Sequence, residues 1–160
     1  MTLAEQVFAL LKRRGLRLAT AESCTGGMVA AAITDLAGSS EIFDRGFVTY
    51  SNLAKAEMLG VVPALIATHG AVSHQVAIAM AEGALLFSKA DISIAISGIA
   101  GPSGGSVEKP VGLVHFACAQ HNLKTLHIEQ RFGSLSRAEI RHHSVKAAFE
   151  LVLSQLTRAP

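Results

Sequence analysis

Residues 16–27 read LRLATAESCTGG, and this stretch decides how the chain is expected to fold. The first seven of these residues, LRLATAE, are typical of a short buried strand. A turn of small polar residues and glycines, SCTGG, follows directly, and residues 28–36 are predicted to form a helix of small residues. A strand that turns straight into a helix indicates an α/β unit, in which helical crossovers join parallel strands.

The rest of the chain extends this pattern. DISIAISG at 91–98 is a continuous apolar run, typical of a strand that is buried on both faces. Further strands are predicted over 41–51, 111–119 and 124–132, and helices over 3–14, 52–60, a short stretch from 63, 74–90 and 136–155. The last two strands follow each other through a turn at His121 and Asn122, so they can pair antiparallel. We therefore predict an α/β fold, a three-layer α/β/α sandwich with a mixed sheet of about five strands.

Length and composition limit the classes of protein to consider. The chain has 160 residues, which fits one domain, and we expect that domain to span residues 1–160. Half of the residues are hydrophobic and 16% are charged, a composition that argues against disorder. The net charge of +2 gives no case for nucleic-acid binding, which calls for basic residues clustered on one face.

The cysteines and the apolar runs bear on the compartment. Cys24 and Cys118 lie in unrelated contexts, so we expect no disulfide framework and a reducing cytoplasm. The first 15 residues have the pattern of an amphipathic helix, without the features of a signal peptide. No apolar run reaches the ~20 residues needed to span a bilayer, so we expect no membrane association.

The turn at residues 20–27 is the first place where chemistry is expected. Backbone N–H groups at the start of a helix lack partners and carry partial positive charge, so they suit a phosphate or an oxyanion. Glycines such as Gly26 let the backbone come close to a ligand. The alternative is that Ser23 or Thr25 simply caps the helix, a common role for these residue types.

A second segment runs from Tyr50, the only tyrosine of the chain, to Lys55. If Asn52 opens a helix, Lys55 lies one turn into it and can project toward the same end of the sheet as Ser23. A buried lysine with a lowered pKa can serve as the general base for a serine hydroxyl, and a tyrosine could orient or relay the proton. The alternatives are an exposed lysine on the helix surface and a tyrosine with a structural role.

The third segment is the glycine-rich loop that follows the apolar strand, SGIAGPSGG at 97–105. Open α/β sheets bind ligands beyond the ends of their strands, where this loop is expected to lie. The loop matches neither GxxxxGK[ST] nor GxGxxG, so a plain connecting loop is the alternative.

The histidines and cysteines bear on two other kinds of site. The seven histidines include no HExxH motif and no coherent set of ligands, so we expect no metal. Cys24 follows Ser23 at the start of a helix, where the pKa of a thiol can be lowered. A cysteine nucleophile is therefore an alternative, although no partner histidine is identifiable.

Four separated motifs then match a known family in order: TAESCTGG at 20–27, TYSNLAK at 49–55, GAVSHQVAIAMAEGA at 70–84 and SGIAGPSGGSVEKPVGLVHFA at 97–117. With them the chain resembles the CinA C-terminal domain family, in its stand-alone form of nicotinamide-nucleotide amidase. The resemblance implies hydrolysis of the carboxamide of nicotinamide mononucleotide, giving nicotinate mononucleotide and ammonia. It also implies a three-layer α/β/α fold, no metal or other cofactor, and a homodimer.

The resemblance assigns roles to particular residues. Ser23 would be the nucleophile, Lys55 its base and Tyr50 the residue that orients or relays the proton. Contacts to the nucleotide are implied for Thr25, Gly26, Asn52, Gly101, Gly104 and Gly105.

One segment departs from the family pattern. The family usually has Gly-Asp-Arg with another arginine four residues on, whereas residues 133–141 here read GSLSRAEIR. Arg137 and Arg141 still lie four apart on one face of a predicted helix, and arginine is well suited to bind a phosphate. The alternative is a solvated helix start. The departure affects the expected phosphate site more than the amide chemistry.

Two rival functions stay open at this stage. One is an amidase that uses the same serine and lysine on another small carboxamide, because this chemistry does not itself specify a pyridine ring. The other is a non-catalytic module that binds a nucleotide or a protein partner.

Overall fold

A computed structural model describes residues 1–158, so the last two residues of the predicted 1–160 domain lie outside the described part. The elements run in the order α1 (Leu3–Arg14), β1 (Leu18–Glu22), α2 (Met28–Thr34), η1 (Ser39–Glu41), β2 (Phe43–Val48), α3 (Asn52–Leu59), α4 (Pro63–His69), α5 (His74–Leu86), β3 (Ile92–Gly98), β4 (Leu113–Gln120), β5 (Leu126–Arg131) and α6 (Arg137–Thr157). The predicted α/β class and the number of strands are confirmed.

The five strands form one mixed sheet in the order β2-β1-β3-β4-β5. β1 pairs in parallel with both β2 and β3, whereas β3–β4 and β4–β5 are antiparallel. The tight turn between β4 and β5 contains Asn122 at a positive φ of 67°, a conformation that asparagine tolerates better than most residues. The late antiparallel pair is therefore where the sequence predicted it.

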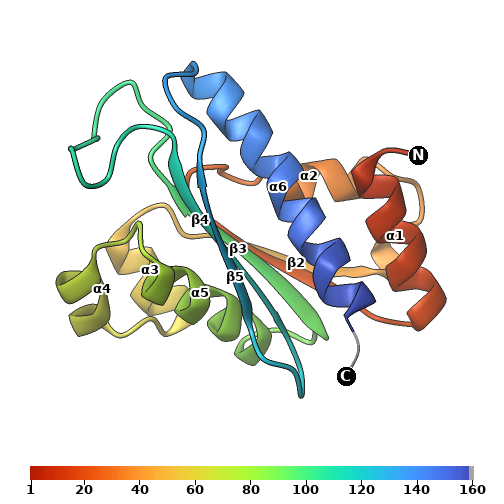
Figure 1. Ribbon diagram of the computed structural model, residues 1–160. Helices are drawn as coiled ribbons and strands as arrows, with labels where there is room; N and C mark the ends of the chain where they lie inside the picture. The colour runs from red at the N-terminus through yellow and green to blue at the C-terminus, as the bar shows by residue number, and fades with distance from the viewer. Residues whose placement is uncertain (159–160) are drawn as a thin grey trace.

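Helices cover both faces of the sheet (Figure 1). α1, α2 and α6 lie on one face, and the core beneath them includes Leu18, Ile94 and Phe116, all fully buried. α3, α4 and α5 lie on the other face, over a second core that includes Ala95 and Met80. Because β1 and β3 are covered on both sides, their residues are buried almost without exception and most of them are apolar, as in other buried strands.

α3 and α5 pack closely against each other because Gly83 of α5 has no side chain. A Cβ atom on Gly83 of α5 would overlap the carbonyl oxygen of Leu59, the last residue of α3. The glycine therefore lets the two helices approach at backbone distance. This contact matters for the site below, because α3 also carries Lys55.

The helix predicted to run to residue 90 ends earlier, at Leu86. The next residues turn back toward the sheet, since the backbone N–H of Lys89 donates to the Asp44 carboxylate at 3.0 Å. The N–H of Asp91 then donates to the carbonyl of Arg17 at 2.8 Å, which starts β3 beside β1. Tertiary hydrogen bonds thus override the local helical pattern of the sequence.

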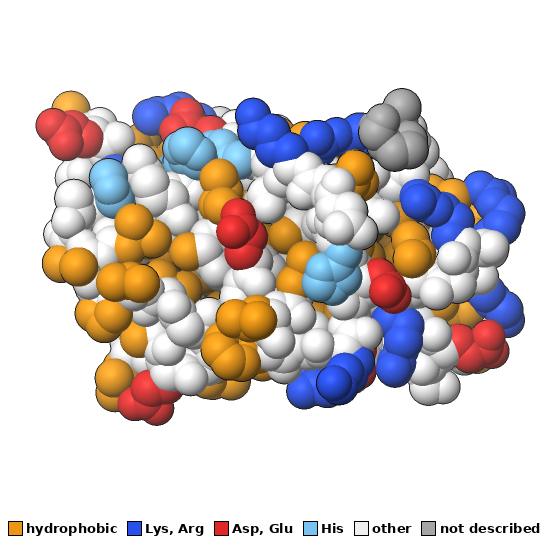
Figure 2. Space-filling model, turned by 90° about the horizontal axis from the view of Figure 1, so that it is seen from below, with side chains coloured by type: hydrophobic (Ala, Val, Ile, Leu, Met, Phe, Trp, Pro, Cys, Tyr) orange, Lys and Arg blue, Asp and Glu red, His pale blue; other side chains and the backbone are white. Residues whose placement is uncertain are grey.

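Apolar side chains are exposed on the side of the molecule that carries α3 to α5. Figure 2 shows hydrophobic side chains gathered on that side of one face, with Lys and Arg lying mainly toward the other. The large exposed ones in this region are Leu53, Met58, Val62, Leu86 and Phe87. None of the helices within residues 1–158 combines the length and hydropathy needed to cross a bilayer.

Candidate active site

The turn after β1 positions Ser23 at the end of the central strands. Its backbone N–H donates to the carbonyl of Ile96 at 2.9 Å, which continues the pairing of β1 with β3 by one residue. The side chain is at the boundary of burial, 9% exposed, and lines a cavity. The position of Ser23 is therefore fixed by the sheet itself, whereas a loop would leave it freer.

Glu22, which is fully buried, stabilises the same turn from the other side. Its carboxylate accepts hydrogen bonds from the Thr25 hydroxyl at 2.7 Å and from the backbone N–H groups of Val29 at 2.8 Å and Ala30 at 3.1 Å. These N–H groups belong to the first turn of α2, where a negative charge is favourable. The expectation of a phosphate at this helix start is wrong, because the protein's own carboxylate occupies it.

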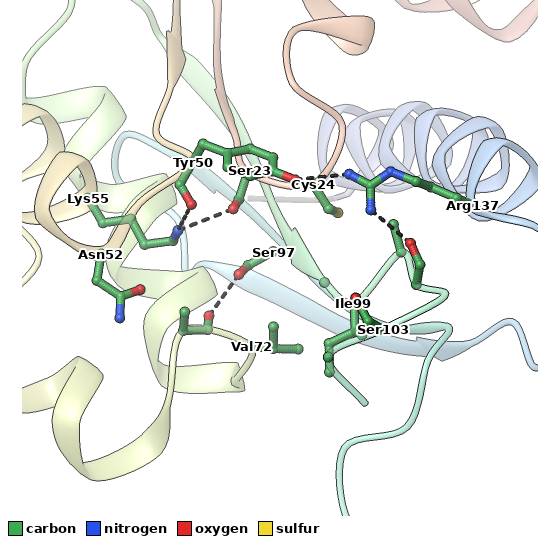
Figure 3. Close-up of a pocket in the computed structure, with 15 residues that line it drawn as sticks. Ser23, Cys24, Tyr50, Asn52, Lys55, Val72, Ser97, Ile99, Ser103 and Arg137 are labelled. Carbon is green, nitrogen blue, oxygen red and sulfur yellow. Dashed lines mark hydrogen bonds between the residues drawn. The ribbon is translucent and has the colours of Figure 1, made fainter. Parts of the chain in front are cut away.

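Lys55 meets Ser23 from α3. Ser51 caps this helix by accepting a hydrogen bond from the Ala54 N–H at 3.0 Å, so Lys55 lies one turn in, as predicted. Its Nζ lies 3.2 Å from Ser23 Oγ (Figure 3) and the residue is only 1% exposed. Among residues 1–158, no carboxylate lies within ion-pair distance of this amine.

The surroundings of the Lys55 amine favour its neutral form. Burial lowers the pKa of Lys55, because an uncompensated ammonium loses its hydration. The amine also lies 2.9 Å from the carbonyl oxygen of Thr49 and 3.5 Å from that of Tyr50. A neutral amine can donate its two N–H groups to these carbonyls and keep its lone pair for the Ser23 hydroxyl. The geometry is thus that of a base held against a serine.

Cys24 lines the cavity next to Ser23 but is a poor nucleophile. Burial raises the pKa of its thiol to about 11, so the thiolate that would attack is scarce at neutral pH. This burial disfavours the sequence-based alternative of a thiol activated at a helix start, because desolvation has the largest effect on the pKa of Cys24.

Tyr50 does not bridge Lys55 and Ser23. Its hydroxyl accepts a hydrogen bond from Arg137 Nη2 at 2.9 Å, and 61% of the residue is exposed. Figure 3 shows the ring reaching across Ser23 toward Arg137, while only the backbone carbonyl of Tyr50 is near the lysine amine. The predicted proton relay has no support, because Lys55 contacts Ser23 directly.

The two arginines of the departing segment have different positions. Arg137, at the start of α6, donates from Nη1 to the carbonyl of Gly101 at 2.8 Å and lines the cavity. Arg141, one turn later, lies outside the cavity lining and donates from Nε to the Cys24 carbonyl at 3.0 Å and from Nη2 to the Thr25 carbonyl at 3.4 Å. Arg141 therefore holds the turn that carries Ser23, and Arg137 is the arginine that faces the cavity.

These side chains surround a cavity of about 270 Å³. Of the residues predicted for the site, it is lined by Ser23, Tyr50, Asn52, Lys55, Gly101, Gly104 and Arg137. Thr25, Gly26, Gly105 and Arg141 are not part of the lining. Thr25 is fully buried beneath the turn with its hydroxyl on Glu22, which removes it from side-chain contact with a ligand in the cavity.

The cavity is also lined by Ser97 and Ser103, which lie in the predicted ligand-binding segment 97–105 without a role of their own, and by Ala71 and Val72, which were not predicted for the site. Ser97 is the most informative of them, because it is the last residue but one of β3 and lies directly beside Ser23. Its signal was in the sequence: Ser97 is next to last in the apolar run 91–98, and Ser23 directly follows the strand predicted over 16–22. Recognising it required the register of β1 against β3. No group of three or more His, Cys, Asp or Glu side chains within residues 1–158 is arranged to hold a metal ion.

Comparison with known proteins gives one consistent result. The family model described as CinA C-terminal domain matches residues 1–156. A nicotinamide-nucleotide amidohydrolase PncC of Escherichia coli K12 is 62% identical over 119 residues, which cover 74% of this chain and 72% of the relative. The protein of the same name from Enterobacter agglomerans is 46% identical over 156 residues, 98% of this chain and 94% of the relative.

A solved structure agrees with these sequence matches. The competence/damage inducible protein CihA from Agrobacterium tumefaciens superposes with a TM-score of 0.94 at 51% identity, covering 98% of this chain and 94% of that one. At this similarity the whole α/β/α arrangement is shared.

Proposed function

This chain belongs to the CinA C-terminal domain family, and we propose that it is an amidohydrolase that converts nicotinamide mononucleotide to nicotinate mononucleotide and ammonia. The contact of the buried Lys55 amine with the Ser23 hydroxyl, at 3.2 Å, is the observation that carries the proposal. The names of the two PncC relatives support the choice of substrate, since both are nicotinamide-nucleotide amidohydrolases.

The proposed reaction begins with attack by Ser23. Lys55 takes the hydroxyl proton as Ser23 Oγ forms a bond to the carboxamide carbon. The resulting ammonium returns that proton to the amide nitrogen as the C–N bond breaks, and ammonia leaves. Water, deprotonated by Lys55, then attacks the ester, and the proton goes back to Ser23 as the C–Oγ bond breaks. The products are the acid and the free serine.

The negative charge of the tetrahedral intermediate needs hydrogen-bond donors near Ser23. The backbone N–H groups of Cys24 and Thr25 make no hydrogen bond within residues 1–158, and Cys24 borders the cavity. We assign the oxyanion site to these N–H groups, because the N–H that follows a nucleophilic serine has this role in other hydrolases. Arg141 and Glu22 hold the turn that presents them.

Release of ammonia from nicotinamide mononucleotide by the purified chain tests this proposal. We expect steady turnover in the presence of a chelator, with nicotinate mononucleotide as the other product. The same assay with free nicotinamide and other small carboxamides measures which substrate is preferred. Binding of the nucleotide without any ammonia release would favour the non-catalytic module instead. Preference for another carboxamide would keep the mechanism and change the substrate.

Arg137 is proposed to bind the phosphate of the nucleotide. Its guanidinium lines the cavity and is held by Tyr50 and Gly101, so it is already oriented before a ligand arrives. Arg137→Ala is expected to raise the KM for the nucleotide about 10–100-fold, since hydrogen bonds to charged groups contribute ~1.5–3 kcal/mol. Steady-state kinetics with the phosphate-free nucleoside is the control, because its KM should hardly change. Equal losses for both substrates would contradict a phosphate role. Tyr50→Phe, which removes only the bond to Arg137, should have a smaller effect.

We also propose a cytoplasmic homodimer, as the family resemblance implies. The exposed apolar side chains on the side of α3 to α5, including Leu53 and Leu86, are consistent with a surface that is covered by a second copy.

A further inference from the structure

Ser97 lies beside the nucleophile on the same face of the sheet. Glu22 pairs with Ile96 in the parallel ladder of β1 and β3, and the next N–H along β1, that of Ser23, donates to the Ile96 carbonyl. Ser97 is therefore the neighbour of Ser23 across the strands. Figure 3 shows its hydroxyl directed into the space that Ser23 and Lys55 also face.

The hydrogen of the Ser97 hydroxyl is already in use. Ser97 Oγ donates to the carbonyl oxygen of Ala71 at 2.7 Å, and the residue is 1% exposed. The segment that carries Ala71 is fixed in turn, because Ser73 Oγ donates to the Gly70 carbonyl at 2.7 Å and caps α5. A serine hydroxyl has one hydrogen and two lone pairs, so Ser97 has only acceptor capacity left for a ligand.

We propose that Ser97 makes the site select a carboxamide over the corresponding carboxylate. This inference rests on the proposed function. The –NH2 of a substrate carboxamide can donate to Ser97 Oγ, whereas the carboxylate of the product has no hydrogen to donate. The product therefore places an oxygen lone pair against the lone pairs of Ser97 and is released more readily. Ser97 is in this way a specificity-determining residue, and it does not take part in bond making.

Asn52 and Ser103, two other polar side chains of the cavity, do not discriminate in the same way. Asn52 carries both donors and an acceptor, so it can bond to an amide or to a carboxylate. The hydroxyl of Ser103 has no hydrogen-bond partner within residues 1–158 and can turn to donate or accept. His115 pairs with Ser97 across β3 and β4 but does not line the cavity, and burial lowers its pKa to about 4. The imidazole is therefore neutral near pH 7 and offers a product carboxylate no positive charge.

The test is to measure the affinity for substrate and product separately in a protein that cannot turn over. In a Ser23→Ala background, isothermal titration calorimetry gives the Kd of nicotinamide mononucleotide and of nicotinate mononucleotide. We expect the amide to bind about tenfold more tightly than the acid, a difference of about 1.4 kcal/mol. In Ser23→Ala/Ser97→Ala this ratio should fall to about one. Ser103→Ala in the same background is the matched control and should leave the ratio unchanged.

The possible outcomes distinguish failure of the inference about Ser97 from failure of the proposed function. An unchanged ratio in the Ser97→Ala protein, with ammonia release intact in the wild type, overturns the inference and leaves the proposed function in place. Absence of both nucleotide binding and ammonia release overturns the two together. If the Ser97→Ala protein does not fold, as judged by circular dichroism, Ser97→Cys keeps the size of the side chain with much weaker hydrogen bonding. This variant should also lower the ratio, and an unchanged ratio would again overturn the inference.

Discussion

Replacement of Lys55 by alanine is expected to lower kcat by about 10²–10⁴-fold, the contribution usual for a positioned general base. The reason is local: within residues 1–158, no other amine, imidazole or carboxylate is recorded in contact with Ser23 Oγ. Steady-state ammonia release measures the loss. Retention of more than about a tenth of the wild-type rate would remove Lys55 from the role of base.

The dependence of kcat/KM on pH in the wild type is a second, independent test of the role of Lys55. Lys55 acts as a base only when it is neutral, so kcat/KM should rise with pH as the amine loses its proton. Because burial lowers the pKa of Lys55, the midpoint of the rise should lie below the ordinary pKa of a lysine. In Lys55→Ala the residual activity should not show this rise with pH. An unchanged pH profile in the variant would assign the rise to another titrating group.

Stability separates a catalytic from a structural role for Lys55. A lysine whose pKa is lowered in the folded state carries no protonation penalty at pH values above its unfolded pKa, and it costs stability when the pH falls below that pKa. Lys55→Met, which keeps the length of the side chain without the charge, should therefore not lower Tm at neutral pH while it abolishes the base. A variant that is both inactive and strongly destabilised would indicate a structural role.

The order of elements was predictable because each element carries its own local signal. The apolar run at 91–98 and the glycine that ends α1 at position 15 are examples, since both report on the backbone without tertiary information. The end of α5 was not predictable in this way, because the hydrogen bond from Lys89 to Asp44 joins residues 45 positions apart. Element boundaries therefore failed where a long-range contact decided them.

The site was predictable to the extent that strand ends and helix starts determine it. Ser23 and Lys55 each follow from such a position, together with the family resemblance. Arg137 and Arg141 have the same spacing signal, yet only one reaches the cavity, because the path of α6 over the turn that carries Ser23 decides between them. The sequence also suggested a phosphate where Glu22 lies. No short-range sequence motif predicts that a buried carboxylate will accept hydrogen bonds from a helix that begins six residues later.

Replacement of Ser23 by alanine is expected to leave no measurable acyl-enzyme and to lower kcat at least as much as the loss of Lys55. In the proposed reaction Ser23 Oγ forms the bond to the carboxamide carbon, and removing either member of a nucleophile–base pair costs about as much as removing both. Ammonia release measures the rate, and mass spectrometry of the acid-quenched wild type during turnover measures a nicotinoyl-nucleotide adduct on the peptide that contains residue 23.

Cys24→Ala is the matched control for the Ser23 variant, since the two residues are adjacent and both border the cavity. Its thiol, with a pKa raised to about 11, contributes little thiolate, so this variant should keep most of the wild-type rate and still form the adduct. The reverse pattern, an active Ser23→Ala and an inactive Cys24→Ala, would assign the nucleophile to the thiol. A double variant Ser23→Ala/Lys55→Ala that is no slower than either single variant would show that the two side chains act as one catalytic unit. Losses that multiply would instead mean that Lys55 contributes through a separate step, such as activation of the water that cleaves the ester.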